Sequence, residues 1–102
     1  MVKIVGVAQK NKEVILYFSY KKGDNIFFKA IASNDGFSFE GKSQYVIVTD
    51  EKKKEDTNYN WKHMFFTNQK DGSFVLYKID GKESSGLNLG FTRDFIHFDK
   101  KG

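Results

Sequence analysis

The chain contains an internal repeat: two β-rich segments of similar sequence follow each other, and the second is shorter than the first. At an offset of 60 residues, segment 3–20 aligns with segment 63–80, and after a one-residue slip 33–39 aligns with 92–98. The six identities are Gln9 with Gln69, Lys10 with Lys70, Leu16 with Leu76, Tyr17 with Tyr77, Asp35 with Asp94 and Phe39 with Phe98. Average residue usage would give about two by chance. Repetition at this spacing predicts a propeller or solenoid, whose units cannot bury their faces alone.

Composition favours an all-β fold. The 102 residues suit one small domain or part of a larger one, and 17% of them are aromatic, with 11 Phe and 5 Tyr. The chain has no cysteine, which excludes a disulfide framework and a thiolate metal site. It also has no proline, so Gly, Asn and Asp must make the turns, as at 23–25, 34–36, 71–72 and 80–81.

The charge is mildly basic, with 17 basic and 13 acidic residues. The lysines fall mostly in predicted turns and have acidic neighbours, which is typical of a solvated surface and argues against nucleic acid as a partner. The N-terminal apolar run is too short for a signal peptide, and no stretch approaches the roughly 20 residues of a membrane span. We therefore expect a cytoplasmic protein with no membrane partner, unless the chain is a piece of a longer precursor.

Hydrophobic patterning predicts strands at 3–9, 14–20, 26–33, 37–39 and 45–48 in a first unit, residues 1–60. A second, shorter unit, residues 61–102, has strands at 63–67, 73–79, 87–92 and 95–98 and lacks a counterpart of strand 45–48. The apolar run 14–18 predicts a central strand covered on both faces. The charged segment 49–60 is expected to be an exposed loop between the units. Short connections favour antiparallel hairpins.

The stretch 14–39 resembles one blade of the five-bladed β-propeller glycosidases. In that family a Tyr- and Phe-rich strand precedes a strand that ends in an A-x-S-x-D-G-x-x-F/W corner, which residues 30–39 resemble. Residues 90–98 resemble the S-x-D-L-x-x-W variant of the corner. The resemblance implies an antiparallel, all-β fold of two propeller-like blades. The alternative is a single small β-sandwich or barrel in which the repeat is accidental.

Three corner residues are interpreted as structural. An aspartate in a short chain reversal accepts hydrogen bonds from nearby backbone N–H groups, which predicts this role for Asp35 and Asp94. Gly36 permits positive φ at the first corner. The competing interpretation is that the two aspartates form the carboxylate pair of a glycosidase.

No complete catalytic or metal site is recognisable. In the enzymes that the chain resembles, catalytic residues lie on several blades, and a chain without proline cannot contain an Asn-Asp-Pro or Arg-Asp-Pro motif. Enzymatic activity is therefore not expected from this chain alone. His63 and His97 are the two histidines, and without clustered carboxylates they make a weak case for a metal site. We expect no cofactor.

The best candidate for ligand binding is the segment around the single tryptophan. Asn58, Tyr59, Asn60, Trp61 and His63 combine aromatic rings with amide donors and acceptors, a mixture that suits a sugar. The competing interpretation is that Trp61 begins an inner strand and packs in the core while Tyr59 shields it.

Three functions are compatible with these patterns. The first is a carbohydrate-binding or glycosidase-like propeller module that lacks complete catalytic machinery and closes its ring as a homo-oligomer, for example a trimer. The second is a fragment of a larger propeller glycosidase that needs additional blades. The third is a structural module that binds a protein through an exposed Phe-rich edge.

Overall fold

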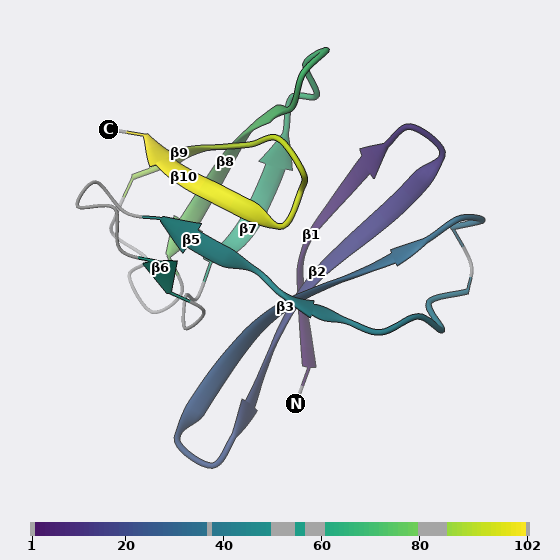
Figure 1. The fold of residues 1–102 in the computed structure, drawn as a ribbon. Coiled ribbons are helices and arrows are strands. Elements are labelled where there is room, and N and C mark those ends of the chain that lie inside the picture. Colours follow the sequence, from purple (N-terminus) through teal and green to yellow (C-terminus); the bar gives the residue numbers. More distant parts are fainter. Residues whose placement is uncertain (1, 37, 50–54, 57–60, 80–85, 102) are drawn as a thin grey trace.

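The computed structural model describes residues 2–36, 38–49, 55–56, 61–79 and 86–101, and it is all-β (Figure 1). The strands of the first half are β1 (Val2–Lys10), β2 (Glu13–Lys22), β3 (Asn25–Ser33), β4 (Gln44–Tyr45), β5 (Ile47–Thr49) and β6 (Glu55–Asp56). Those of the second half are β7 (Trp61–Phe66), β8 (Ser73–Ile79), β9 (Asn88–Thr92) and β10 (His97–Lys101). Alternation of apolar and polar residues with short Gly- and Asn-containing turns is the pattern that forms such hairpins.

The strands form one sheet in the order β4-β3-β2-β1-β7-β8-β9-β10-β5-β6. β1, β2 and β3 are consecutive antiparallel neighbours, and so are β7, β8, β9 and β10. A parallel contact between β1 and β7, with Gly6 opposite Met64, joins the two groups. A Cβ atom on Gly6 would lie 2.7 Å from the Cβ atom of Met64, so glycine allows the two strands to approach each other here.

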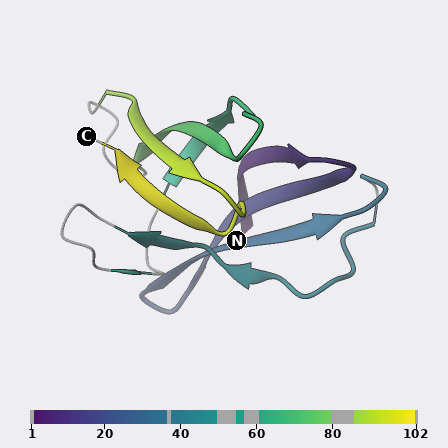
Figure 2. The ribbon, with the colours of Figure 1, turned by 45° about the horizontal axis from the view of Figure 1, so that its top comes forward.

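The segment 44–49 brings the two ends of the sheet together. Its first part pairs with β3, and the backbone N–H of Val46 donates to the carbonyl of Phe28 at 3.0 Å. Its second part pairs in parallel with β10, and Ile47 N–H donates to the carbonyl of Ile96 at 3.0 Å. In Figure 2 this segment runs from beside β3 to beside β10. The sheet is therefore a nearly closed, barrel-like structure.

The prediction of two propeller blades is wrong for this structure, and the alternative of a small barrel is the better description. Propeller blades are separate sheets arranged around a channel. Here the two groups of strands are joined edge to edge by hydrogen bonds, so they belong to one sheet. β5 also pairs with β10, which gives the second group the neighbouring strand that its own sequence lacks.

Aromatic side chains fill the interior of the barrel. Tyr17, Phe28, Trp61, Tyr77 and Phe98 are all buried. The Trp61 and Tyr77 rings stack with centroids 3.5 Å apart, and Phe98 meets Tyr17 and Trp61 edge-on. Each buried ring contributes about 1.5–3 kcal/mol by leaving water, and the aromatic pairs add further stabilisation. Within the described residues, no helix has the length and hydrophobicity needed to cross a bilayer.

Candidate functional site

Trp61, the centre of the predicted binding segment, lies in the barrel core. Its side chain is only 1% exposed, and the rings of Tyr77, Phe98 and Phe28 surround it. The Trp61 ring therefore has no face available to a dissolved sugar, and its prediction as a ligand platform is corrected. The physical reason is the start of β7: the first residue of this strand points into the barrel, where the largest apolar side chain fills the most space.

Of the other members of that segment, the structure describes His63. Asn58, Tyr59 and Asn60 lie outside the described residues. His63 is exposed and adopts a left-handed backbone conformation, with φ of 51°, at the point where the pairing of β7 and β8 shifts register. Trp61 is therefore buried in the core whereas His63 is at the surface, so these two described members of the segment do not share a binding surface.

The first predicted corner follows β3. The hydroxyl of Ser33 donates to Asp35 Oδ1 at 2.8 Å and accepts the N–H of Gly36 at 3.0 Å. Asp35 Oδ1 also accepts the N–H of Ser38 at 2.8 Å, and Gly36 has a φ of 78°. These contacts are those of a side-chain-capped turn, in which the carboxylate satisfies local backbone donors.

The second corner, between β9 and β10, is built in a similar way. Thr92 Oγ1 accepts the N–H of Phe95 at 2.8 Å, and Asp94 Oδ1 accepts the N–H groups of Ile96 and His97 at 2.9 and 2.7 Å. The His97 ring also contacts Asp94 Oδ2 at 2.5 Å. Partial burial raises the pKa of Asp94, but the hydrogen bonds from His97 and Ile96 outweigh this effect, so the net pKa is lowered.

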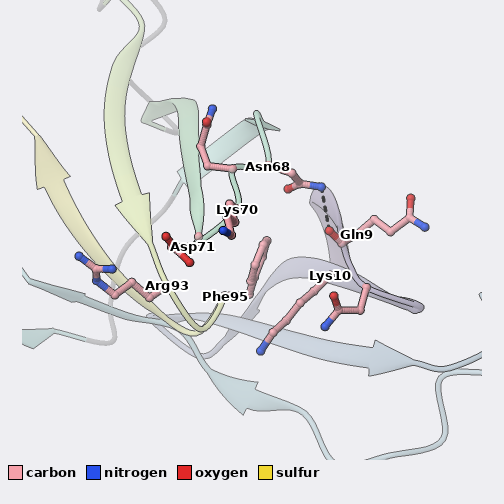
Figure 3. A pocket seen from close by; sticks show the side chains of 10 residues that line it. Gln9, Lys10, Asn68, Lys70, Asp71, Arg93 and Phe95 are labelled. Carbon is pink, nitrogen blue, oxygen red and sulfur yellow. Dashed lines mark hydrogen bonds between the residues drawn. The ribbon is translucent and has the colours of Figure 1, made fainter.

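A pocket of about 540 Å³ lies where three turns meet at one end of the barrel, and we call it the turn pocket (Figure 3). The turns are those that connect β1 to β2, β7 to β8 and β9 to β10. The lining residues are Gln9, Lys10, Asn11, Asn68, Gln69, Lys70, Asp71, Gly72, Arg93 and Phe95. Its volume is within the range of about 300–1,000 Å³ that ligand sites occupy.

The base of the turn pocket is held from inside the barrel. The Tyr17 hydroxyl donates to the carbonyl of Phe95 at 2.6 Å, a buried contact between β2 and the β9–β10 turn. Phe95 is itself buried and has a φ of 68°, so this hydrogen bond and that from its N–H to Thr92 hold a left-handed conformation in place. Burial, and to a smaller degree the charge of Asp94, raises the pKa of Tyr17, which keeps its phenol protonated as a donor. The wall around Phe95 is therefore fixed by the fold.

Amide and cationic side chains line much of the rest of the pocket. Asn68 Nδ2 donates to the carbonyl of Gln9 at 2.8 Å, so the first and second turns are tied together across the pocket (Figure 3). The ammonium of Lys10 lies 6.0 Å from the centroid of the Phe95 ring. Lys70 and Arg93 add positive charge, and among the described lining residues Asp71 is the single carboxylate. This arrangement suits an anionic ligand that carries hydroxyl groups.

The sequence analysis did not place a site at these turns, although one signal was present. Gln9-Lys10 and Gln69-Lys70 are identical dipeptides at equivalent positions of the internal repeat, and both line the turn pocket. In the sequence they indicate a repeat but not a cavity. The third turn contributes Arg93.

Comparison with known proteins finds no protein-family model that matches the chain and no curated protein with significant sequence similarity. Within the part of the chain that the structure describes, no group of three or more His, Asp or Glu side chains is placed to hold a metal ion. The function must therefore be argued from the turn pocket itself.

Proposed function

We propose that this chain is a carbohydrate-binding module that holds an acidic saccharide, such as a uronic acid oligomer, in the turn pocket. The observation that carries the proposal is the convergence of two Gln-Lys pairs, one at the end of β1 and one in the β7–β8 turn, on one pocket. The resemblance of residues 14–39 to glycosidase blades is consistent with a sugar ligand. The proposal keeps the predicted role in carbohydrate binding but locates the site at the turns and not at Trp61.

The chemistry of the lining matches that ligand class. Amide groups both donate and accept, so they can hydrogen-bond sugar hydroxyls in either direction. Lys10, Lys70 and Arg93 outnumber the one described carboxylate of the lining, Asp71, which favours a carboxylate- or sulfate-bearing sugar over a neutral one. The guanidinium of Arg93 lies over the Phe91 ring, 5.4 Å from its centroid, and by turning toward the pocket it can form two parallel hydrogen bonds to a carboxylate. Hydrolysis is not part of the proposal, because glycosidases generally need a pair of carboxyl groups on either side of the scissile bond.

The proposal is tested by titrating the ¹⁵N-labelled protein with an oligogalacturonate and following backbone and side-chain amide signals by NMR. A neutral oligosaccharide of the same length is the parallel titration. We expect the acidic sugar to shift the signals of Gln9, Asn68 and Gln69, and added salt to weaken the binding because charges attract less strongly when screened. Shifts that are equal with the neutral sugar would contradict the anionic specificity, and no shifts with either sugar would contradict carbohydrate binding.

Two variants locate the site. Arg93→Gln and Lys70→Gln should each weaken binding by about tenfold, since a charge-assisted hydrogen bond contributes about 1.5–3 kcal/mol. Lys22→Gln is the matched control, because Lys22 is exposed at the end of β2 beside the β2–β3 turn and does not line the pocket. Equal weakening by all three variants would indicate attraction to the net charge of the protein and would contradict a site in the turn pocket.

A further inference from the structure

The outer surface of the barrel carries a continuous row of apolar side chains. Cross-strand register places Leu16 opposite Val7, Phe65 opposite Leu76, and Leu76 opposite Leu89. The parallel contact between Gly6 and Met64 places the next residues, Val7 and Phe65, beside each other. The row therefore crosses β2, β1, β7, β8 and β9, and we call these five residues and their immediate apolar neighbours the outer apolar face.

The neighbours widen the face along the strands. On β8 and β9, Phe74 lies opposite Phe91 and their rings meet edge-on, 5.1 Å apart. On β1 and β2, Ile4 lies opposite Phe18. Phe65 is 63% exposed and Ile4 59%. Large apolar side chains on several adjacent strands are thus exposed together.

The exposed area is large for a monomer. Val7, Phe65, Ile4, Phe74 and Leu89 are between 38% and 63% exposed. Because the largest side chains of this kind have about 150–250 Å² of surface, their exposed parts sum to roughly 500 Å². Most soluble monomers expose no contiguous apolar patch much above a few hundred Å². One side of a standard interface buries about 800 Å², of which about 65% is apolar in homodimers, so the face supplies the apolar part of one such interface.

The sequence of β2 gives independent support. Residues 14–18 are apolar without interruption, a pattern that predicts a strand covered on both faces. In the barrel, Ile15 and Tyr17 point inward and are buried, whereas Leu16 and Phe18 on the outer face are only partly buried. One face of this strand is therefore covered by the fold, and the other has the composition of a surface that a second layer covers.

We propose that the outer apolar face is a self-association interface, on which a second copy of this chain packs with the same face in a two-fold symmetric dimer. Two sheets stack face to face at about 10 Å when apolar rows interdigitate, and an isologous dimer needs a single patch that is complementary to itself. The centre of the face carries no charge from Leu16 to Leu89, which matches a homodimer better than a charged partner. This inference stands independently of the proposed sugar ligand, and the two surfaces meet at Arg93, which lines the turn pocket and lies over the Phe91 ring.

Charge at the edge of the face sets the expected salt dependence. Lys62 and Lys78 lie directly opposite each other on β7 and β8, next to the row that contains Phe65 and Leu76. These charges lie at the rim and not in the apolar centre of the face, so screening them should not dissociate the dimer, which should be at least as tight as ionic strength rises. An acidic partner protein would bind more weakly as ionic strength rises, because salt screens its attraction to the lysines.

The test is sedimentation velocity or light scattering on a sizing column over a wide concentration range. We expect a monomer–dimer equilibrium with a dissociation constant on the order of micromolar or tighter. Phe65→Ser should raise this constant at least tenfold. Tyr45→Ser is the matched control: Tyr45 is an exposed aromatic residue on β4, which lies four strands from β7 in the sheet order. Far-UV circular dichroism checks that each variant is folded, and Phe65→Lys replaces Phe65→Ser if that variant is not.

Each outcome is decisive. A dimer that Phe65→Ser disrupts and Tyr45→Ser preserves supports the proposal. A monomer up to about millimolar concentration overturns it, and so does a trimer, because a three-fold ring cannot be built from one isologous contact. A dimer that both variants weaken equally, or that high salt dissociates, would place the contact elsewhere and also contradict the proposal.

Discussion

The buried hydrogen bond from the Tyr17 hydroxyl to the carbonyl of Phe95 gives the sharpest test of how this fold is held together. It joins β2 to the β9–β10 turn across 78 positions of sequence. Tyr17→Phe removes the donor while leaving the ring and its contacts with Phe28, Phe66 and Phe98. The carbonyl oxygen of Phe95 is then a buried acceptor that has lost this partner. We therefore expect the free energy of unfolding to fall by about 1–3 kcal/mol.

The same residue should make the protein sensitive to alkali. Burial raises the pKa of Tyr17 far above its ordinary value of 10.0, whereas the unfolded chain keeps the ordinary value. Below pH 10 the phenol is protonated in both states and its contribution to stability is complete. Above pH 10 the unfolded state releases the proton and the folded state does not, so stability falls by about 1.4 kcal/mol per pH unit.

Urea unfolding of the wild type and of Tyr17→Phe at pH 8, 10 and 11 measures both effects. We expect the variant to be less stable at pH 8 and the difference to shrink by about 1.4 kcal/mol between pH 8 and pH 11, most of it above pH 10, because the variant has no phenol at this position. Tyr45→Phe is the control, since Tyr45 is exposed on β4 and should change stability by less than about 0.5 kcal/mol. A difference between wild type and Tyr17→Phe that stays constant across this pH range would refute the reasoning.

Two further substitutions test the joint between β1 and β7 and the second corner. Gly6→Ala should lower the free energy of unfolding, measured with heat or urea, by about 1–3 kcal/mol, because the added Cβ would lie 2.7 Å from the Cβ of Met64. Gly41→Ala is the control: an added Cβ there would meet no neighbouring atom within 4 Å, so this variant should be neutral or slightly stabilising. Asp94→Ala should cost about 1 kcal/mol or less at pH 7, a modest figure because the carboxylate is half exposed to solvent. Since the pKa of Asp94 in the folded state is lowered, its contribution to stability is complete above the ordinary value of 3.8 and is lost as pH falls below it. The stabilities of the wild type and Asp94→Ala should therefore converge in acid. A stability difference that is the same at all pH values would contradict this role.

The sequence alone was sufficient for the local structure. The predicted strands 14–20, 26–33 and 73–79 correspond to β2, β3 and β8, because alternating or continuous apolar runs between Gly- and Asn-rich turns leave few other choices. The predicted strand 37–39 is not observed at residues 38 and 39, and Phe37 lies outside the described residues. The strand after the second corner, predicted at 95–98, begins later, at His97. The reason is that Asp94 and Thr92 cap a turn that occupies residues 93–96.

The arrangement of the strand groups could not be derived in the same way. Hairpins are fixed by turns that are local in sequence, but the parallel contacts of β1 with β7 and β5 with β10 join strands that are remote from each other. A blade and a segment of barrel have the same alternating pattern, so periodicity cannot distinguish them. The contact between Gly6 and Met64 depends on a glycine inside the predicted strand 3–9, and periodicity does not show which remote residue lies against it.

The location of the site follows from where the repeated identities lie. Tyr17 and Tyr77 are both in the core, so packing is a sufficient reason for a tyrosine at both positions. The two Gln-Lys dipeptides differ, because Gln9, Gln69 and Lys70 are exposed and no packing requirement selects these residue types. Residues that recur at exposed turns need another explanation, and their convergence on one cavity supplies it. In a chain of this kind, identity between units is therefore more informative about binding at exposed positions than at buried ones.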